Sequence, residues 1–307
     1  MPHVSVVIPC YNASATLDRT LASLMAQTFT DWEAICVDDG SSDNTLARLY
    51  EVARADARFR VVQQENAGPS VARNRGVELA SGRIVSFLDA DDLWRPGKLA
   101  SVVGAFSQFP DAGAVYGQIA FFRNEDEDDA TTSTVTPGVL ALDTCLGENP
   151  VCTLSNLSVE RAAFLLSGGF DPSMVHGEDL EWLVRGVLAG LPVIGVDEPH
   201  VRYRASEEGL SANLMAMHSG WRRAVSGARV ALGAKALQQA EAVHLRYLAR
   251  RALRMGKPAH VALGLAARGL ALGPRAFLGG RHRGPATLLG CLAAPFLPTA
   301  LRRRAFA

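Results

Sequence analysis

Three groups of carboxylates in this chain of 307 residues could bind a cation or accept a proton. In the first group, Asp89, Asp91 and Asp92 follow directly after an apolar run at 84–88. Carboxylates this close together repel one another unless a cation or hydrogen-bond donors compensate their charge. Hard oxygen ligands of this type suit Mg²⁺ or Mn²⁺. A solvated loop in which Asp92 caps the next helix is the alternative interpretation.

The second and third groups are acidic pairs. Asp38 and Asp39 precede a glycine and could accept hydrogen bonds from a ribose or a nucleobase N–H. An Asx-type turn followed by a helix cap is the alternative; it accounts for Asp43, but it explains Asp38 and Asp39 less well. Glu178 and Asp179 enter an apolar helix, where one of them could act as a carboxylate base. Acidic residues also stabilise a helix N-terminus without any catalytic role, so this pair alone does not establish a site.

A polar segment that begins at Asn66 is a further candidate. Pro69 fits the first turn of a helix, whose N-terminus attracts anions. Arg73 follows one turn later and could reach the same ligand. We expect Arg75, in contrast, to solvate the outer face of the helix.

Alternating strands and helices are predicted for the first hundred residues and would position these side chains. Short apolar runs predict strands, and apolar residues at helical spacing predict helices. The predicted strands are 4–8, 34–37, 61–62 and 84–88, and the predicted helices are 15–27, 43–55 and 69–80. This order implies an α/β fold with a mostly parallel sheet, whose ligands bind at the carboxyl ends of the strands.

Charge is distributed unevenly along the chain, although the formal net charge is zero. Residues 1–219 sum to −15, whereas residues 220–307 sum to +15 and contain Glu241 as their single acidic residue. The basic region has few aromatic residues and no groove-reading motif, so nucleic acid is not an expected partner. We therefore predict two regions, a catalytic domain at 1–212 and a basic helical region at 213–307.

The compartment is predicted from cysteines and apolar runs. Five scattered cysteines without Cys-x-x-Cys spacing indicate neither a disulfide framework nor a zinc site, and they fit a reducing cytosol. The first residues do not have the pattern of a secretory signal. The longest uncharged run, 286–301, is broken by two prolines and falls short of the roughly 20 apolar residues of a transmembrane helix.

Taken together, the motifs resemble those of the family 2 glycosyltransferases in both order and approximate spacing, from residue 4 to about residue 211. The matching blocks are Pro9-Cys10-Tyr11-Asn12, Val37-Asp38-Asp39-Gly40-Ser41, Ala72-Arg73-Asn74-x-Gly76, Asp89-Ala90-Asp91-Asp92, Gly168-Gly169-Phe170-Asp171 and Glu178-Asp179. The resemblance implies a GT-A fold and transfer of a sugar from a nucleotide donor with inversion at the anomeric carbon. UDP is the expected nucleotide.

The resemblance also implies roles for single residues. The residues that would contact the nucleotide are Pro9, Tyr11, Asp39, Asn66, Arg73, Asp89 and Arg204. Asp91, together with Asp89, would bind Mn²⁺ or Mg²⁺ at the diphosphate. Asp179 would be the general base for the acceptor hydroxyl, and Glu178 would orient the donor sugar or the acceptor.

One position departs from the family pattern. Members often have Tyr-Arg-x-His where this chain has Tyr203-Arg204-Ala205-Ser206. The missing histidine implies that the metal is held mainly by Asp91, phosphates and water. His200 or His176 could substitute, although a structural role is the commoner one for a lone histidine.

We therefore expect an inverting, metal-dependent enzyme that acts in cell-surface glycan synthesis in the cytoplasm and transfers to a hydroxyl of a saccharide or lipid-linked acceptor. An inert nucleotide-sugar-binding subunit is one alternative. A nucleotidylyltransferase is a weaker one, because no glycine-rich loop follows the first strand. For the basic residues around 281–307 we expect contact with an anionic membrane at its inner face, or packing against the acidic domain.

Overall fold

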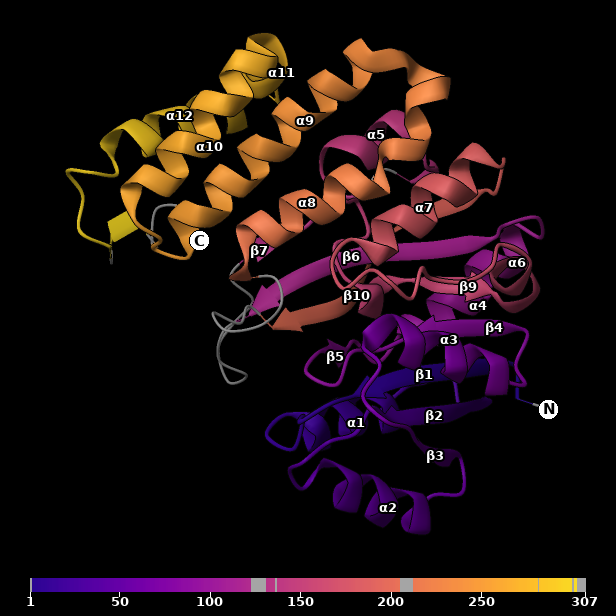
Figure 1. The fold of residues 1–307 in the computed structure, drawn as a ribbon. Coiled ribbons are helices and arrows are strands. Elements are labelled where there is room, and N and C mark those ends of the chain that lie inside the picture. The colour runs from indigo at the N-terminus through magenta and orange to yellow at the C-terminus, as the bar shows by residue number, and fades with distance from the viewer. Residues whose placement is uncertain are drawn as a thin grey trace.

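The computed structural model describes residues 2–122, 131–135, 137–204, 212–280, 282–299 and 301–302 (Figure 1). Within these ranges, ten strands form one sheet in the order β3-β2-β1-β4-β9-β6-β10-β5, with β7 paired to β6 and β8 paired to β10. The strands are β1 (Val4–Cys10), β2 (Trp32–Asp38), β3 (Phe59–Gln63), β4 (Ile84–Phe87), β5 (Leu93–Trp94), β6 (Ala114–Phe122), β7 (Thr131–Thr132), β8 (Gly138–Val139), β9 (Ser158–Glu160) and β10 (Val193–Arg204).

The strand pairing confirms the predicted mostly parallel sheet. Strands β3, β2, β1 and β4 are parallel neighbours, and β6 and β10 form a second parallel pair. The short strand β9 is antiparallel to both β4 and β6 and joins the two groups. Cys10 at the end of β1 pairs with Asp38 at the end of β2. The loops that follow these strands therefore emerge at one edge of the sheet.

Helices cover both faces of this sheet. They are α1 (Leu17–Met25), α2 (Thr45–Ala55), α3 (Pro69–Leu79), α4 (Lys98–Gln108), α5 (Leu142–Gly147), α6 (Arg161–Leu166), α7 (Glu178–Leu188), α8 (Leu214–Ala224), α9 (Arg229–Arg254), α10 (Ala259–Leu272), α11 (Pro274–Leu278) and α12 (Arg283–Ala293). One hydrophobic core lies between the sheet and α1, α2 and α4, and a second lies between the sheet and α3, α5, α6 and α7.

The helices after residue 213 enclose a third hydrophobic core of their own. Helix α9 carries this group against α5, and α10 to α12 lie beyond α9 on the side away from the sheet (Figure 1). The guanidinium of Arg246 is buried and donates to the carbonyls of Ala276, Phe277 and Gly279 and to Glu148 Oε1 at 3.1 Å. In the ranges described, no helix has both the length and the apolar character needed to cross a membrane.

A glycine allows α3 to lie directly on β1. A β-carbon at Gly76 would lie 2.3 Å from Cγ1 and 3.1 Å from Cγ2 of Val7, which points from β1 into the core. Contacts of that length require the helix or the strand to move. The close approach matters because α3 also carries Arg73 toward the end of β4.

We expect Gly76→Ala to lower the free energy of unfolding by about 1–3 kcal/mol, because the added methyl group overpacks the core at Val7. Gly104→Ala, in α4, is the matched control: its β-carbon would meet no atom within 4 Å, so this change should be neutral or stabilising. Urea unfolding measures both. Equal stability of the two variants would contradict the close packing, whereas adding Val7→Ala to Gly76→Ala should recover part of the loss.

Candidate functional site

The loops that follow β1, β2 and β3 interlock at the carboxyl edge of the sheet. The backbone N–H of Asn12 donates to Ser41 Oγ at 3.0 Å, and Asn12 Oδ1 accepts from the backbone N–H of Ser42 at 2.8 Å. Gly40 adopts a φ of 75°, and a β-carbon there would lie 3.0 Å from the backbone nitrogen of Asn66. The glycine therefore lets the third loop close over the second.

Asp39 is the buried centre of these loops. Its carboxylate accepts from Gln64 Nε2 at 2.7 Å and from the backbone N–H groups of Ala67 and Gly68, both at 2.9 Å. A carboxylate has about four acceptor sites, so one stays available for a ligand donor. Tyr11 is 55% exposed beside this region. These contacts show a structural role for Asp39, and its contact with a nucleotide stays a prediction.

Arg73 joins three distant segments of the chain. Its buried guanidinium donates from Nη2 to Asp89 Oδ1 at 2.6 Å and from Nη1 to Glu178 Oε1 at 3.0 Å. Burial opposes the charge of Arg73, but these two carboxylates outweigh it and raise the pKa of the guanidinium. Helix α3, the loop after β4 and the start of α7 therefore meet at one cation, whereas Arg75 is exposed as expected.

The two acids at the start of α7 have different partners. Gly177, with a φ of 77°, precedes them and turns the chain into the helix. Glu178 is buried against Arg73, and burial raises its pKa to about 7, with Asp179 adding to the rise and Arg73 opposing it. Asp179 Oδ2 accepts a hydrogen bond from Asn149 Nδ2. Burial also raises the pKa of Asp179, although its hydrogen bonds and Arg73 act in the opposite direction.

Thr153 and Ser155 hold the loop after β4 in place. The backbone N–H of Asp89 donates to Ser155 Oγ at 2.9 Å. Thr153 Oγ1 lies 3.3 Å from Asp89 Oδ2 and 3.2 Å from Asp92 Oδ2. Asp92 is buried and accepts from the backbone N–H of Arg204 at 3.0 Å. The interpretation of Asp92 as a helix cap is therefore wrong, because it ties this loop to the end of β10.

Asp91 is the carboxylate that points outward from this loop. Its side chain is exposed and makes no hydrogen bond or ion pair with another described residue. Although the residue as a whole is exposed, atoms of the surrounding loop crowd its carboxylate; this partial loss of hydration raises its pKa to about 6, and repulsion by Asp89 adds to the rise. The described ranges contain no group of three or more His, Cys, Asp or Glu side chains placed to hold a metal. The carboxylate of Asp91, unpaired within the part of the chain that the structure describes, suits a divalent cation that takes most of its other ligands from phosphate and water.

His200 does not replace the missing family histidine, whereas the role of His176 stays a prediction. His200 is fully buried, its Nε2 lies 2.9 Å from Ser101 Oγ, and burial lowers its pKa to about 3. It is a neutral core residue. Burial also lowers the pKa of the half-buried His176. Ser206 lies outside the described residues, and Arg204 donates from Nε to the carbonyl of Asp91 at 2.9 Å.

Several residues of the site were missed by reasoning from the sequence. They are Asn149, Thr153, Ser155 and Lys98. Lys98 is fully buried, donates from Nζ to the carbonyl of Ser155 at 2.5 Å and lies 3.7 Å from the ring centroid of Trp94. Burial holds the pKa of Lys98 well below its usual range, while Asp92 and Asp89 oppose that shift. The polar residues Thr153, Ser155 and Asn156, inside an otherwise apolar segment, were the feature of the sequence that could have indicated these contacts.

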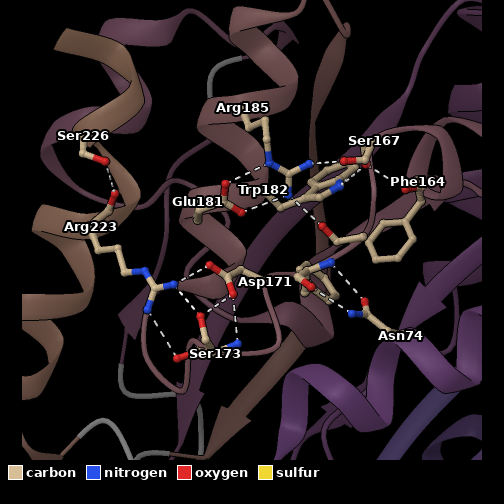
Figure 2. Close-up of polar contacts among 12 residues, drawn as sticks. Asn74, Phe164, Ser167, Asp171, Ser173, Glu181, Trp182, Arg185, Arg223 and Ser226 are labelled. Carbon is tan, nitrogen blue, oxygen red and sulfur yellow. Dashed lines mark hydrogen bonds and ion pairs between the residues drawn. The ribbon is translucent and has the colours of Figure 1, made fainter.

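The loop before α7 is fixed from both sides (Figure 2). The side chain of Asn74, from α3, accepts from the N–H of Phe170 at 3.0 Å and donates to its carbonyl at 2.8 Å. Arg223, from α8, pairs with Asp171 at 2.6 Å. Trp182 Nε1 donates to Ser167 Oγ at 2.8 Å. These contacts set the position from which Glu178 and Asp179 reach the acidic centre.

Comparison with known sequences identifies relatives of this chain. The sequence profile of Glycosyl transferase family 2 matches residues 5–165. WfgD of Escherichia coli, a UDP-Glc:alpha-D-GlcNAc-diphosphoundecaprenol beta-1,3-glucosyltransferase, is 30% identical over 213 residues, which are 68% of this chain and 80% of that protein. TuaG of Bacillus subtilis, whose name assigns it provisionally to teichuronic acid biosynthesis, is 46% identical over 99 residues. These cover 32% of this chain and 39% of TuaG, so the similarity spans less than half of that relative.

Solved structures share the fold. The mannosyltransferase PcManGT of Pyrobaculum calidifontis, in complex with GDP-Man and Mn²⁺, superposes with a TM-score of 0.64 at 21% identity and covers 99% of this chain and 84% of its own. TarS of S. aureus, in complex with UDP-GlcNAc, has a TM-score of 0.57 at 16% identity and covers 94% and 92%. At such identities the likeness establishes the fold alone, and it confirms the expected GT-A architecture with a helical C-terminal region.

We expect Arg73→Gln to lower the free energy of unfolding by about 3 kcal/mol above neutral pH, because two largely buried carboxylates lose their shared cation. Arg75→Gln, on the exposed side of the same helix, should change it by less than about 0.5 kcal/mol. The loss should shrink as the pH falls through the raised pKa of Glu178, about 7, because a protonated Glu178 needs no counter-charge. Urea unfolding across this range would contradict the ion-pair assignment if both variants behaved alike.

Proposed function

Because the chain belongs to glycosyltransferase family 2, we propose that it transfers a sugar from a nucleotide-diphosphate sugar, with inversion, to a hydroxyl of a glycan or lipid-linked acceptor. The observation that carries this proposal is the shared contact of Arg73 with Asp89 and Glu178. This contact brings the predicted donor residues and the predicted base of α7 to one place at the carboxyl edge of the sheet.

The donor would bind across the loops after β1, β2 and β4. The nucleobase would lie against Tyr11 and the remaining acceptor site of Asp39, near Pro9 and Asn66, and the ribose would contact Asp89. We infer UDP as the nucleotide. The relative WfgD is named for UDP-Glc, whereas the structural neighbour PcManGT was solved with GDP-Man, so the donor assay must include both nucleotides.

Asp179 would supply the base for the transfer. Its carboxylate takes the proton of the acceptor hydroxyl while that oxygen bonds to the anomeric carbon and the bond from this carbon to the diphosphate breaks. Asn149 holds Oδ2 of Asp179, and Oδ1 accepts from the backbone N–H of Leu180 at 2.7 Å, so the orientation of the carboxylate is fixed at both oxygens. Glu178, paired with Arg73, would orient the donor sugar or the acceptor.

Asp91 and Asp89 would hold Mn²⁺ or Mg²⁺. Such an ion supplies positive charge that stabilises the departing diphosphate. Arg204 is fixed to the carbonyl of Asp91 and stands at the same edge of the sheet. The exposed carboxylate of Asp91 and its repulsion by Asp89 both favour cation binding.

We expect Asp179→Asn to keep nucleotide binding and to lose transfer by about 10²–10⁴-fold, because general-base assistance is removed. In the unmodified chain, the rate of transfer should fall as the pH drops through the pKa of Asp179, which lies above the usual range of an aspartate.

A panel of UDP-, TDP- and GDP-sugars with Mn²⁺, screened by thermal shift and then by turnover, identifies the donor for this assay. Asp143→Asn, at an exposed carboxylate of α5, is the control. Full turnover by Asp179→Asn would exclude this residue as the base, and nucleotide-sugar binding without turnover in the unmodified chain would favour an inert binding subunit.

We further infer that α12 and the residues after it contact an anionic membrane surface on the cytoplasmic side. Leu289, Leu292 and Phe296 are 66%, 54% and 86% exposed, whereas Cys291 and the rest of the inner side of α12 are buried. Exposed apolar side chains beside arginines such as Arg283 are typical of interfacial helices. The acceptor of WfgD is named as diphosphoundecaprenol-linked, and a lipid-linked acceptor here would also lie at a membrane.

The double variant Leu289→Ser/Phe296→Ser should bind vesicles containing phosphatidylglycerol at least about tenfold more weakly, because each buried apolar side chain contributes ~1.5–3 kcal/mol. Co-sedimentation measures the bound fraction. Leu166→Ser, at an 88% exposed leucine of α6, is the matched control and should bind like the unmodified chain. Unchanged binding of the double variant would exclude α12 as the contact surface.

A further inference from the structure

Three arginines on one turn of α9 form a cluster that the proposed chemistry does not use. Arg254 lies four residues after Arg250 and three after Arg251, so its side chain neighbours both on the helix surface. All three are half-buried. Burial lowers the pKa of Arg254, and the charges of Arg251 and Arg250 add to this effect. The cluster therefore concentrates positive charge where water only partly screens it.

Arg254 is not compensated by a carboxylate of its own region. Glu241, the single acidic residue of 220–307, lies 3.2 Å from His218 Nε2 and is committed there. The guanidinium of Arg254 makes no hydrogen bond or ion pair with any residue in the described ranges. A half-buried guanidinium of this kind is suited to an anionic ligand, above all to the oxygens of a phosphate.

The segment from Asn149 to Thr153 places this cluster beside the acidic centre. Asn149 donates to Asp179, and Thr153 contacts Asp89 and Asp92. One residue before this segment, Glu148 Oε1 accepts from Arg246, which lies two helical turns before Arg254 on α9. This stretch of chain therefore contacts the predicted base through Asn149 and α9 through the neighbouring Glu148.

Cys152, inside this segment, is influenced by both groups. Burial raises the pKa of its thiol to about 11, Arg251 and Arg254 lower it, and Asp179 and Asp92 raise it. Tyr203, near the end of β10, in turn acts on the pKa of Arg251. In Figure 1 the C-terminal end of α9 correspondingly lies over the carboxyl ends of β6 and β10. The arginines thus stand at the same edge of the sheet as the acidic centre.

We propose that Arg254, with Arg250 and Arg251, binds a phosphate or diphosphate group of the acceptor and thereby directs the acceptor hydroxyl toward Asp179. This inference rests on the proposed glycosyl transfer and adds the chemical class of the acceptor. The donor diphosphate has its own predicted partners, which are the cation that Asp91 would hold on the loop after β4 and the guanidinium of Arg204 at the end of β10.

The test is calorimetric titration of the full chain, without metal, with inorganic pyrophosphate and separately with farnesyl diphosphate. We expect Arg254→Gln to weaken both about tenfold, the loss of one charge-assisted phosphate contact. Arg254→Lys should retain part of the affinity. Arg229→Gln, at the exposed opposite end of α9, carries the same change of charge and should bind like the unmodified chain. If Arg254→Gln does not fold, Arg250→Gln replaces it.

Four results would overturn the proposal: unchanged affinity in Arg254→Gln, equal weakening by Arg229→Gln, an equal loss of UDP affinity in Arg254→Gln, or binding of pyrophosphate without binding of farnesyl diphosphate. The third result would assign the arginines to the donor, and the fourth would assign the site to free phosphate. These titrations do not depend on turnover. Failure of the transfer assay therefore contradicts the proposed function without deciding the titrations, and the reverse also holds.

Discussion

The acidic centre depends on one buried cation. Asp89 and Glu178 come from segments nearly ninety residues apart in the sequence. Because both carboxylates are largely shielded from water, their charges would repel each other without Arg73 between them. The guanidinium fork suits this position because it can donate to two carboxylates from separate nitrogens. Two neighbouring contacts fix the position of Arg73: α3 approaches β1 closely at Gly76, and Asn74 holds the loop before α7.

The same arrangement explains the protonation of the α7 acids. One cation shared by Asp89 and Glu178 cannot fully offset burial, so the pKa values of Glu178 and Asp179 stay above their usual range. A carboxylate whose pKa is raised is a stronger base than an exposed aspartate once it is ionised. A cation bound at Asp91 would oppose this rise, because nearby positive charge lowers the pKa of a carboxyl group.

Local patterns were sufficient to predict the sheet and much of its carboxyl edge. Parallel strands place consecutive loops together, so Asp39, Asp89 and Arg73 could be assigned to one edge without knowledge of any contact. Asn149 and Thr153 could not, since they reach the edge through the antiparallel insertion of β9, which local periodicity does not reveal. Asp92 was misinterpreted for a related reason: its partner is the end of β10, more than a hundred residues away.

Basic residues of the later helices form ion pairs with acidic residues of the preceding region. Arg223 pairs with Asp171, and Arg246 and Arg283 both reach Glu148, so basic residues of the later helices hold the loops that frame α7. These pairs account for some of the excess positive charge, and they fix α9 against the segment that precedes Asn149. The C-terminal end of α9 is thereby held near the segment 149–153. The half-buried Arg254 at this end makes no ion pair with a residue in the described ranges, so an anion bound beside it would offset part of the cost of its burial.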